Sequence, residues 1–370
     1  MHIPRRPGPL VVAIPARDEA EEIGPCLLSL AAQHAARIDA VVLCLNNCRD
    51  GTPDVVRTIA GHLPFQVHPI EITLPADCAS AGRARRIAME RAADLAGHDG
   101  VLFTTDADSR AGPDWIAANI TALAAGAEAV AGRAVIDPEG AKLVPAHLHA
   151  IDARECAYAA LLDEIRALLD PDPADPWPRH DEESGASIAV TVAAYRRAGG
   201  MPALPLGEDR AFFDELRRVD ARIRHAPDVT VIVSARIEGR AQGGMADTMR
   251  RRIERPDPLL DARLEPAADA LRRARLRRRV REIWCMPEWG VMTDATARLG
   301  LSPARLGELL ATGHFGAAWA MVEAASPVLR HRKRVPLQAL PEQTARALRI
   351  RDRLRREAGR AGTALYAAAE

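Results

Sequence analysis

The sequence lacks a long apolar run, an excess of charge of either sign, and all but two lysines. No apolar run approaches the roughly 20 residues of a membrane-spanning helix, and residues 1–9 lack the apolar segment of a secretory signal. Basic and acidic residues number 50 each, so no net charge draws the chain to nucleic acid or to an anionic membrane. Only Lys142 and Lys333 are lysine, so nearly all basic residues are arginine. In so arginine-rich a chain, a single arginine is weak evidence of function. We expect a soluble, cytoplasmic protein.

Several familiar site motifs are also missing. The six cysteines include no C-x-x-C pair, which favours reduced cysteines acting as small apolar residues. The sequence contains no P-loop, no G-x-G-x-x-G after its first apolar segment, no H-E-x-x-H or Cys/His zinc spacing, and no G-x-S-x-G. These absences exclude P-loop, dinucleotide, zinc and α/β-hydrolase sites of the usual kinds.

The first half of the chain alternates short apolar segments with helical patterns. We predict strands at 10–14, 40–45, 65–72, 101–105 and 127–135, and helices at 18–33, 50–60, 80–96 and 113–125. This alternation predicts an α/β fold whose mostly parallel central sheet carries helices on both faces.

The second half is more varied and ends in helices. We predict helices at 143–169 and 208–218, a loop rich in Pro and Asp at 170–183, and one or two strands at 222–234 split at Pro227. No strand pattern follows residue 245. We therefore expect a domain at 1–245 and an α-helical C-terminal region at 246–370.

Polar residues follow three of the predicted strands. They are Pro15 to Glu19, Asn46 to Asp50, and Asp106 to Asp108. Because ligands bind outside the carboxyl ends of the strands in such sheets, these segments should meet in one crevice. Residues i and i+2 of a strand face the same way, so both aspartates could reach one Mg²⁺ or Mn²⁺ shared with substrate phosphates. The alternative is that the pair caps the following helix.

These segments, together with Ala84-Arg85-Arg86 and Gly207-Glu208-Asp209-Arg210, resemble family 2 glycosyltransferases of the GT-A fold over about residues 9–245. The resemblance implies that Pro15, Ala16, Arg17 and Glu19 line the nucleoside. Asn46 stands where the family often has an aspartate contacting the base. Arg85 matches a basic position near the diphosphate. Asp106 and Asp108 match the D-x-D contacts to metal and ribose, and Glu208 and Asp209 match an acidic pair on the acceptor side.

The implied reaction is a metal-dependent, hexosyltransferase-like transfer of a sugar from a nucleotide-diphosphate sugar to an acceptor hydroxyl. Arg85, with Arg236 or Arg240, could add charge-assisted bonds to phosphate oxygens. Asp209, ahead of Glu208, is the candidate general base, and a base opposite the leaving group predicts inversion at the anomeric carbon. The donor sugar, its base, the acceptor (a small molecule, a lipid-linked molecule or a glycan) and the oligomeric state are not indicated.

Two other functions compete with this one. A sugar nucleotidyltransferase has a similar sheet, but its glycine-rich first loop is missing from Pro15 to Glu19. A non-catalytic nucleotide-sugar-binding or scaffold protein could keep the crevice, although retention of Asp106, Asp108 and Asp209 argues against it.

The strongest basic patch is the arginine run at 272–281. Such a run is typical of a solvated helix face paired with nearby acids, and contact with anionic lipid headgroups of a membrane, a polyanionic acceptor or nucleic acid is the alternative. Few aromatic residues accompany it, which argues against binding to single-stranded nucleic acid.

Overall fold

The computed structural model describes residues 8–236, 239, 244–255, 257–286 and 289–367. Contacts divide the chain into two compact units. The first, here called the sheet unit, comprises 1–145, 182–217 and 221–254, and the second, here called the helical unit, comprises 146–181, 218–220 and 255–370. The domain boundary expected after residue 245 stays a prediction.

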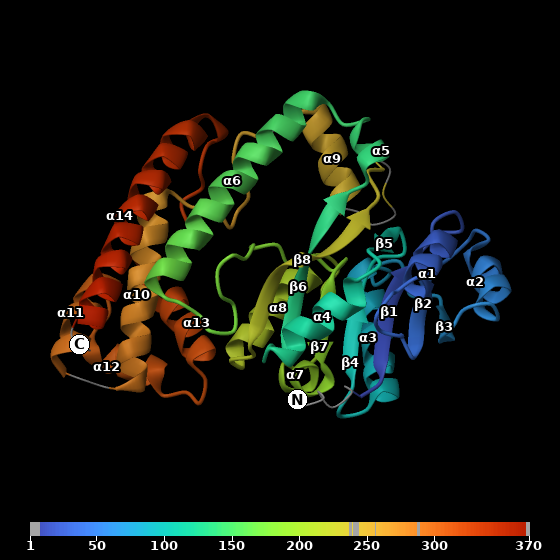
Figure 1. The fold of residues 1–370 in the computed structure, drawn as a ribbon, viewed down its shortest axis with the longest axis horizontal. Coiled ribbons are helices and arrows are strands. Elements are labelled where there is room, and N and C mark those ends of the chain that lie inside the picture. Colours follow the sequence, from blue (N-terminus) through green and yellow to red (C-terminus); the bar gives the residue numbers. More distant parts are fainter. Residues whose placement is uncertain (1–7, 237–238, 240–243, 256, 287–288, 368–370) are drawn as a thin grey trace. The chain divides into compact units, whose positions relative to one another are not determined.

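The sheet unit is built on one mixed sheet of eight strands in the order β3-β2-β1-β4-β7-β6-β8-β5 (Figure 1). Pairs β1–β2, β2–β3, β1–β4 and β6–β8 are parallel, and pairs β4–β7, β6–β7 and β5–β8 are antiparallel. The strands are β1 Leu10–Ala16, β2 Ala40–Asn46, β3 Gln66–Ile72, β4 Val101–Thr104, β5 Ser109–Ala111, β6 Ala129–Ile136, β7 Ile188–Thr191 and β8 Ile223–Val233.

Helices cover both faces of this sheet, as the sequence predicts. The helices of the sheet unit are α1 Ile23–Ala31, α2 Thr52–Ala60, α3 Ala81–Ala96, α4 Trp115–Ala124, α5 Pro138–Ala141, α7 Val192–Arg197, α8 Glu208–Arg218 and α9 Met245–Glu254. Alternate residues of β1 face the two cores: Val12 and Ile14 pack with α1, whereas Val11 and Ala13 pack with α3. Both sets are fully buried, which explains why the central strands are continuous apolar runs.

The sequence pattern did not reveal the antiparallel strands β5 and β7. Strands β5 and β7 are three and four residues long, too short for a recognisable period. The strand expected to break at Pro227 is continuous, because the register with β6 shifts between Ala131 and Arg133 and the extra residues around Pro227 bulge out. Helix α1 begins only at Ile23, since Asp18 takes a left-handed conformation (φ 53°) and the residues after it form turns.

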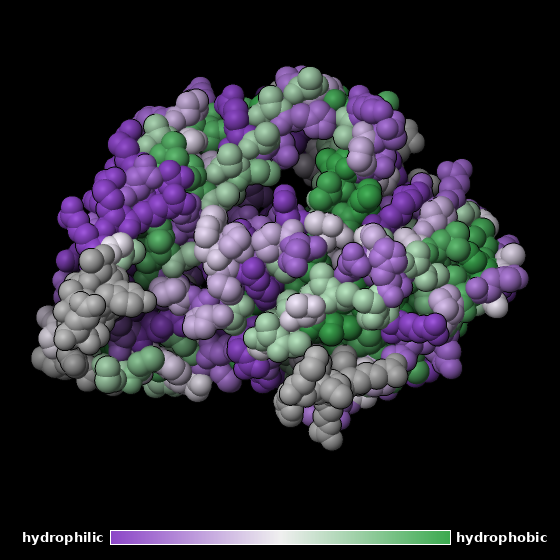
Figure 2. All heavy atoms as spheres, in the orientation of Figure 1, coloured by the Kyte–Doolittle hydropathy of each residue, from purple (hydrophilic) through white to green (hydrophobic). Residues whose placement is uncertain are grey.

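The helical unit contains no strand among its described residues. Its helices are α6 Ala146–Leu169, α10 Ala267–Cys285, α11 Trp289–Leu299, α12 Pro303–Leu310, α13 Phe315–Ala325, the 3-10 helix η1 Leu337–Ala339 and α14 Leu340–Ala367. In α14 the buried residues Leu340, Ala347 and Leu354 recur every seventh position, which gives one narrow apolar stripe. Figure 2 shows hydrophilic side chains gathered over the same helix.

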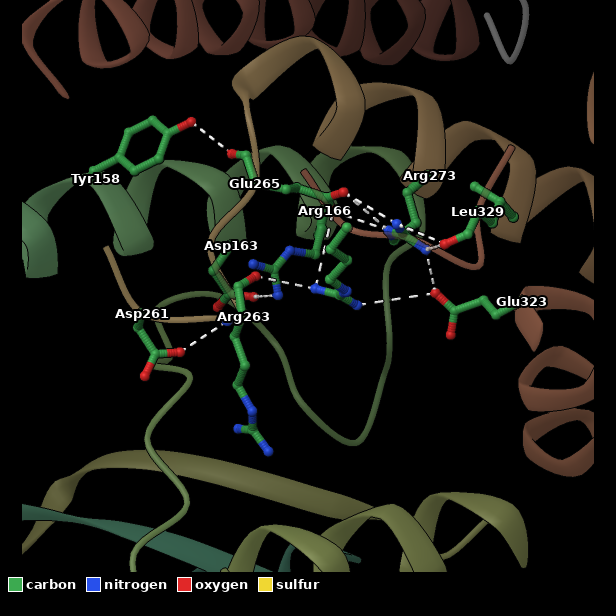
Figure 3. A network of polar contacts seen from close by, with 10 residues as sticks. Tyr158, Asp163, Arg166, Asp261, Arg263, Glu265, Arg273, Glu323 and Leu329 are labelled. Carbon is green, nitrogen blue, oxygen red and sulfur yellow. Dashed lines mark hydrogen bonds and ion pairs between the residues drawn. The ribbon is translucent and has the colours of Figure 1, made fainter. Parts of the chain in front are cut away.

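A polar network ties α6, α10 and the segment after α13 together (Figure 3). Arg273 donates to Glu265 at 2.9 Å, to Glu323 at 2.5 Å and to the Leu329 carbonyl at 3.2 Å. The Tyr158 hydroxyl donates to the Glu265 carbonyl at 2.8 Å. Because Glu265 is 4% exposed, its charge is stabilised by this pairing.

The arginine run of α10 has two different faces. Arg273, Arg277 and Arg281 recur every fourth residue and make internal ion pairs, the last two with Asp170. The side chains between them lie on other faces of the helix. Within the described residues, no helix combines the length and hydropathy needed to cross a bilayer. The cytoplasmic location stays a prediction.

Candidate active site

The loops that follow β1 and β2 are held together by side chains of one bonding to the backbone of the other. Thr52 Oγ1 accepts from the Glu19 N–H at 2.8 Å, and Asp50 accepts from the Ala20 N–H at 3.0 Å. In the other direction, Asp18 accepts from the Arg49 N–H at 2.7 Å. These bonds fix Glu19 at the carboxyl edge of the sheet.

Asn46 is the last residue of β2 and is 2% exposed. Its Nδ2 donates to the Ser80 carbonyl at 3.3 Å, but its Oδ1 is buried without a hydrogen-bond partner. A buried acceptor left unpaired costs about 1–3 kcal/mol, so such atoms are rare in folded proteins. Thr105 Oγ1, which follows β4, is unpaired in the same way.

Arg236 bridges an acid of the loop after β1 and an acid of the turn after β4. Its guanidinium donates to both Glu19 carboxylate oxygens, at 2.7 and 2.5 Å, and lies 3.1 Å from Asp108. Glu19 and Asp108 are 217 and 128 positions away in the sequence, so only the fold unites the three. The side chain of Arg236 is 26% exposed, which leaves part of it open to solvent.

Asp106 and Asp108 lie in the turn between β4 and β5, not on the strand itself. The strand alternation invoked from the sequence therefore does not orient them, although the two carboxylates still influence each other. Burial, and next the charge of Asp106, raise the pKa of Asp108 to about 6, while Arg236 opposes this rise. The turn therefore holds two carboxylates close together in a partly buried place, where the ionised form of Asp108 is disfavoured.

Arg85 is buried at the centre of the site. It donates to Asp106 at 2.6 Å, to Glu208 at 3.0 Å, and to Thr104 Oγ1 and the Gly185 carbonyl at 2.8 and 2.9 Å. Burial lowers its pKa, but the charges of the two carboxylates outweigh this and hold that pKa above the ordinary value. Arg85 therefore joins the turn after β4 to the start of α8.

Glu208 and Asp209 occupy the first turn of α8 but differ in surroundings. Glu208 is 7% exposed and pairs with Arg85, whereas Asp209 is half-buried and accepts from the Gly185 N–H at 2.9 Å. A Cβ at Gly82 would lie 2.2 Å from the Leu204 carbonyl, and one at Gly185 would lie 2.7 Å from the Arg85 guanidinium. Glycine at both positions therefore permits this close approach.

The structure brings most of the predicted site residues to one edge of the sheet unit. Arg85 contacts Asp106 and Glu208, with Asp209 joined through Gly185, and Arg236 contacts Glu19 and Asp108. The turn that carries Asp106 and Asp108 joins these two sets. Pro15 and Ala16 are buried in β1, and Arg17 is 39% exposed beside Asp18. Arg240 lies outside the described residues. Their functional roles stay predictions.

The sequence pattern did not predict two groups of the site, namely the Thr104 hydroxyl and the peptide of Gly185. Gly185 binds Arg85 with its carbonyl and Asp209 with its N–H. The run of small residues Ser184-Gly185-Ala186 before β7 is the only sequence signal that marks this position.

The aspartate turn fits a hard divalent cation in its chemistry. Among the described residues, no cluster of three or more His, Cys, Asp or Glu side chains could hold a metal ion. Mg²⁺ is commonly bound through one or two carboxylates together with substrate phosphates, and does not need a cage made by protein alone. The mutual repulsion of Asp106 and Asp108 is what such an ion would relieve.

Comparison with known proteins supports the family expected from the sequence. Residues 11–169 match the model described as glycosyl transferase family 2. Comparison with curated proteins finds no match.

Among solved structures, TarS 1–349 from S. aureus in complex with UDP-GlcNAc is similar at 16% identity and a TM-score of 0.47, covering 94% of this chain and 92% of its own. Mannosyltransferase PcManGT from Pyrobaculum calidifontis, in complex with GDP-Man and Mn²⁺, is similar at 17% identity and a TM-score of 0.41, covering 94% and 86%. Similarity this low carries no argument about function. Residues 11–169 of the chain are thus similar to glycosyl transferase family 2, and the sheet unit that contains most of them is a mixed α/β sheet with helices on both faces.

Proposed function

We propose that the chain transfers a sugar from a nucleotide-diphosphate sugar to an acceptor hydroxyl, with a divalent cation at Asp106 and Asp108, with Asp209 as general base and with inversion at the anomeric carbon. One observation carries this proposal. Arg85 lies between Asp106 and Glu208, whose neighbour is Asp209, so the proposed cation-binding turn and the candidate base belong to one hydrogen-bonded site.

The nucleotide half of the site is supported by the two strand-end loops. The buried Asn46 Oδ1 would accept a hydrogen bond from an N–H of the base, which would satisfy an atom that has no partner within the chain. Glu19 and Arg236 lie at the same edge, where Arg236 could exchange its contact with Asp108 for a phosphate oxygen.

Asp106 and Asp108 would hold Mg²⁺ or Mn²⁺, which when bound supplies positive charge to the leaving diphosphate. Arg85 keeps Asp106 in place through its 2.6 Å contact. Since Arg85 donates to four protein acceptors, we assign it a positioning role in preference to direct contact with phosphate.

Asp209 is the better base of the acidic pair. Glu208 is buried and neutralised by Arg85, whereas Asp209 is half-buried and oriented by backbone donors at 2.9 and 2.7 Å, from Gly185 and Arg210. It could accept a proton from an acceptor hydroxyl that attacks the anomeric carbon. A base on the face opposite the departing diphosphate gives inversion.

The test is a thermal-shift series with UDP, GDP, CDP and TDP, each with and without Mn²⁺ or Mg²⁺. We expect at least one nucleotide to raise the Tm only with metal, and Asp108→Ala to abolish that rise. Asp99→Ala is the matched control, because Asp99 precedes β4 while Asp108 follows it, and its side chain is 93% exposed. A complete absence of nucleotide-dependent shifts in the wild-type protein would contradict the proposal.

Product analysis separates the competing functions. A transferase or slow hydrolase releases nucleoside diphosphate from its nucleotide-sugar, and the anomer formed reports inversion. Release of pyrophosphate from a sugar-1-phosphate and a nucleoside triphosphate would indicate a nucleotidyltransferase. Metal-dependent binding of nucleotide-sugars without any turnover would indicate a binding protein.

A further inference from the structure

A groove of about 540 Å³ lies within the helical unit, away from the aspartate turn in sequence. Helix α10 forms its longest wall, α11 contributes Asp294 and Arg298, and Val328 closes one side. This volume falls in the range of roughly 300–1,000 Å³ that is usual for small-molecule sites.

The groove has an apolar lining within an arginine rim. Leu271, Leu276 and Val328 supply apolar surface, and Val328 is 39% exposed. Arg272, Arg275 and Arg279 belong to the same wall, because residues three, four and seven apart share one side of a helix. This is the face of the arginine run that does not take part in the internal network.

The cations of this rim are not balanced by acids. Arg275 is exposed and has no ion-pair or hydrogen-bond partner in the described part of the chain, whereas Arg298 pairs with Asp294 at 3.0 Å. The other carboxylates are each shared by two cations: Asp269 by Arg272 and Lys333, and Glu282 by Arg278 and Arg279. The rim therefore keeps excess positive charge next to apolar surface.

The polar network of Arg273 adjoins one wall of the groove. Arg273 donates to the carbonyl of Leu329 at 3.2 Å (Figure 3), and Leu329 follows Val328 in the chain. Glu265 and Glu323 fix Arg273 in turn. The Val328 wall is thus anchored by a network that does not depend on an occupant, and such preorganisation lowers the cost of binding.

We propose that this groove binds an anionic amphiphile, a molecule with a single apolar chain and a phosphate or similar oxyanion head. The chain lies on Leu271, Leu276 and Val328, and the head is bound by Arg275 with support from Arg272 or Arg279. Arginine forks match the oxygens of such heads. A helix about 10 Å wide fills roughly 400 Å³ per turn, so the groove suits a small molecule better than a partner helix.

This site needs neither a nucleotide nor a sugar, so it goes beyond the proposed function and its test is independent of that function. Dodecyl phosphate is the probe, titrated calorimetrically into the full chain below the concentration at which the probe aggregates. We expect saturable binding at least tenfold tighter than that of inorganic phosphate. Decyl phosphate should bind about 15-fold more weakly, since each buried methylene contributes about fourfold.

Two variants test the head and the chain separately. Arg275→Glu should weaken dodecyl phosphate binding at least tenfold, and Ala268→Trp, which fills the groove without changing its charge, should weaken it similarly. Arg349→Glu is the matched control, because Arg349 is an exposed helical arginine that does not line the groove. Its affinity should remain within twofold of wild type.

Three results would overturn the proposal. The first is no binding of dodecyl phosphate to the wild-type chain. The second is a failure of the controls to discriminate: equal binding by wild type, Arg275→Glu and Ala268→Trp, or of dodecyltrimethylammonium, which carries the opposite charge. The third is Arg275-dependent sedimentation with phosphatidylglycerol vesicles without any binding of monomeric dodecyl phosphate, because the arginines would then form a membrane-docking surface.

Discussion

Arg85 and Asp106 lie 2.6 Å apart, although one belongs to a helix and the other to a turn at the far end of the next strand. The side chain of Arg85 is 5% exposed, and the side chain of its other carboxylate partner, Glu208, is 9% exposed. Removing one partner of a buried ion pair leaves a charge without compensation, which costs far more than the loss of an exposed pair. The aspartate turn and the first turn of α8 therefore depend on a single guanidinium.

Replacement of Arg85 should destabilise the protein strongly. We expect Arg85→Met to lower the free energy of unfolding by about 3–5 kcal/mol, measured by urea denaturation. Arg86→Met is the neighbouring control: Arg86 is 37% exposed and pairs with Glu90 one helical turn away, so its loss should cost less than about 1 kcal/mol. Equal effects of the two substitutions would contradict the central place given to Arg85.

Asp108 should make stability depend on pH. Its pKa of about 6 in the folded protein exceeds the ordinary value of 3.8, because burial and Asp106 disfavour the ionised form. The folded state thus binds a proton more tightly than the unfolded state, and the ionised carboxylate costs stability above about pH 6. This cost disappears as the pH falls towards 4.

Asp108→Asn should consequently stabilise the nucleotide-free protein at pH 7.5, by on the order of 1–3 kcal/mol. The gain should shrink between pH 6 and pH 4, measured by urea denaturation at each pH. Asp99→Asn, at a highly exposed position, should show no such trend. A stabilisation that is the same at pH 4 and pH 7.5 would mean that the carboxylate is not strained in this way.

Asn46 should contribute to nucleotide binding through its unpaired oxygen. We expect Asn46→Ala to weaken metal-dependent nucleotide binding about tenfold, the effect of losing one hydrogen bond at a buried site. Asn46→Asp retains an acceptor oxygen and should bind more tightly than the alanine variant. Isothermal titration with the nucleotide selected by thermal shift measures both, and an unchanged affinity in Asn46→Ala would place the base elsewhere.

We expect substitutions of Asp209 and Glu208 to have different effects, because Asp209 is the proposed base and Glu208 positions Arg85. Asp209→Asn should lower turnover of the nucleotide-sugar by about 10²–10⁴ while leaving the nucleotide-dependent Tm rise intact. Glu208→Gln should instead lower the Tm of the free protein, because Arg85 loses its buried counter-ion. The reverse pattern, with turnover lost only in Glu208→Gln, would transfer the role of base to Glu208.

Local patterns in the sequence predicted the elements that carry the site. The apolar runs of β1, β2 and β4 and the acids placed after them were recognisable, because a buried strand requires continuous apolar residues. Helix α8 and its acidic first turn were predicted with the bounds that the structure has. The short strands β5 and β7 were not predicted, since three or four residues carry no measurable period.

By itself, the sequence determined the alternating α/β order, the resemblance to a family and the positions of the candidate acids, because these depend on composition and on spacing along the chain. Only the tertiary structure decided which charges meet. Arg85 and Glu208 are 123 positions apart, and nothing local distinguishes the buried Arg85 from the partly exposed Arg86. In the same way, the fold assigned Arg273 to an internal network and left Arg275 at an open groove, since burial and partners arise only when distant segments pack together.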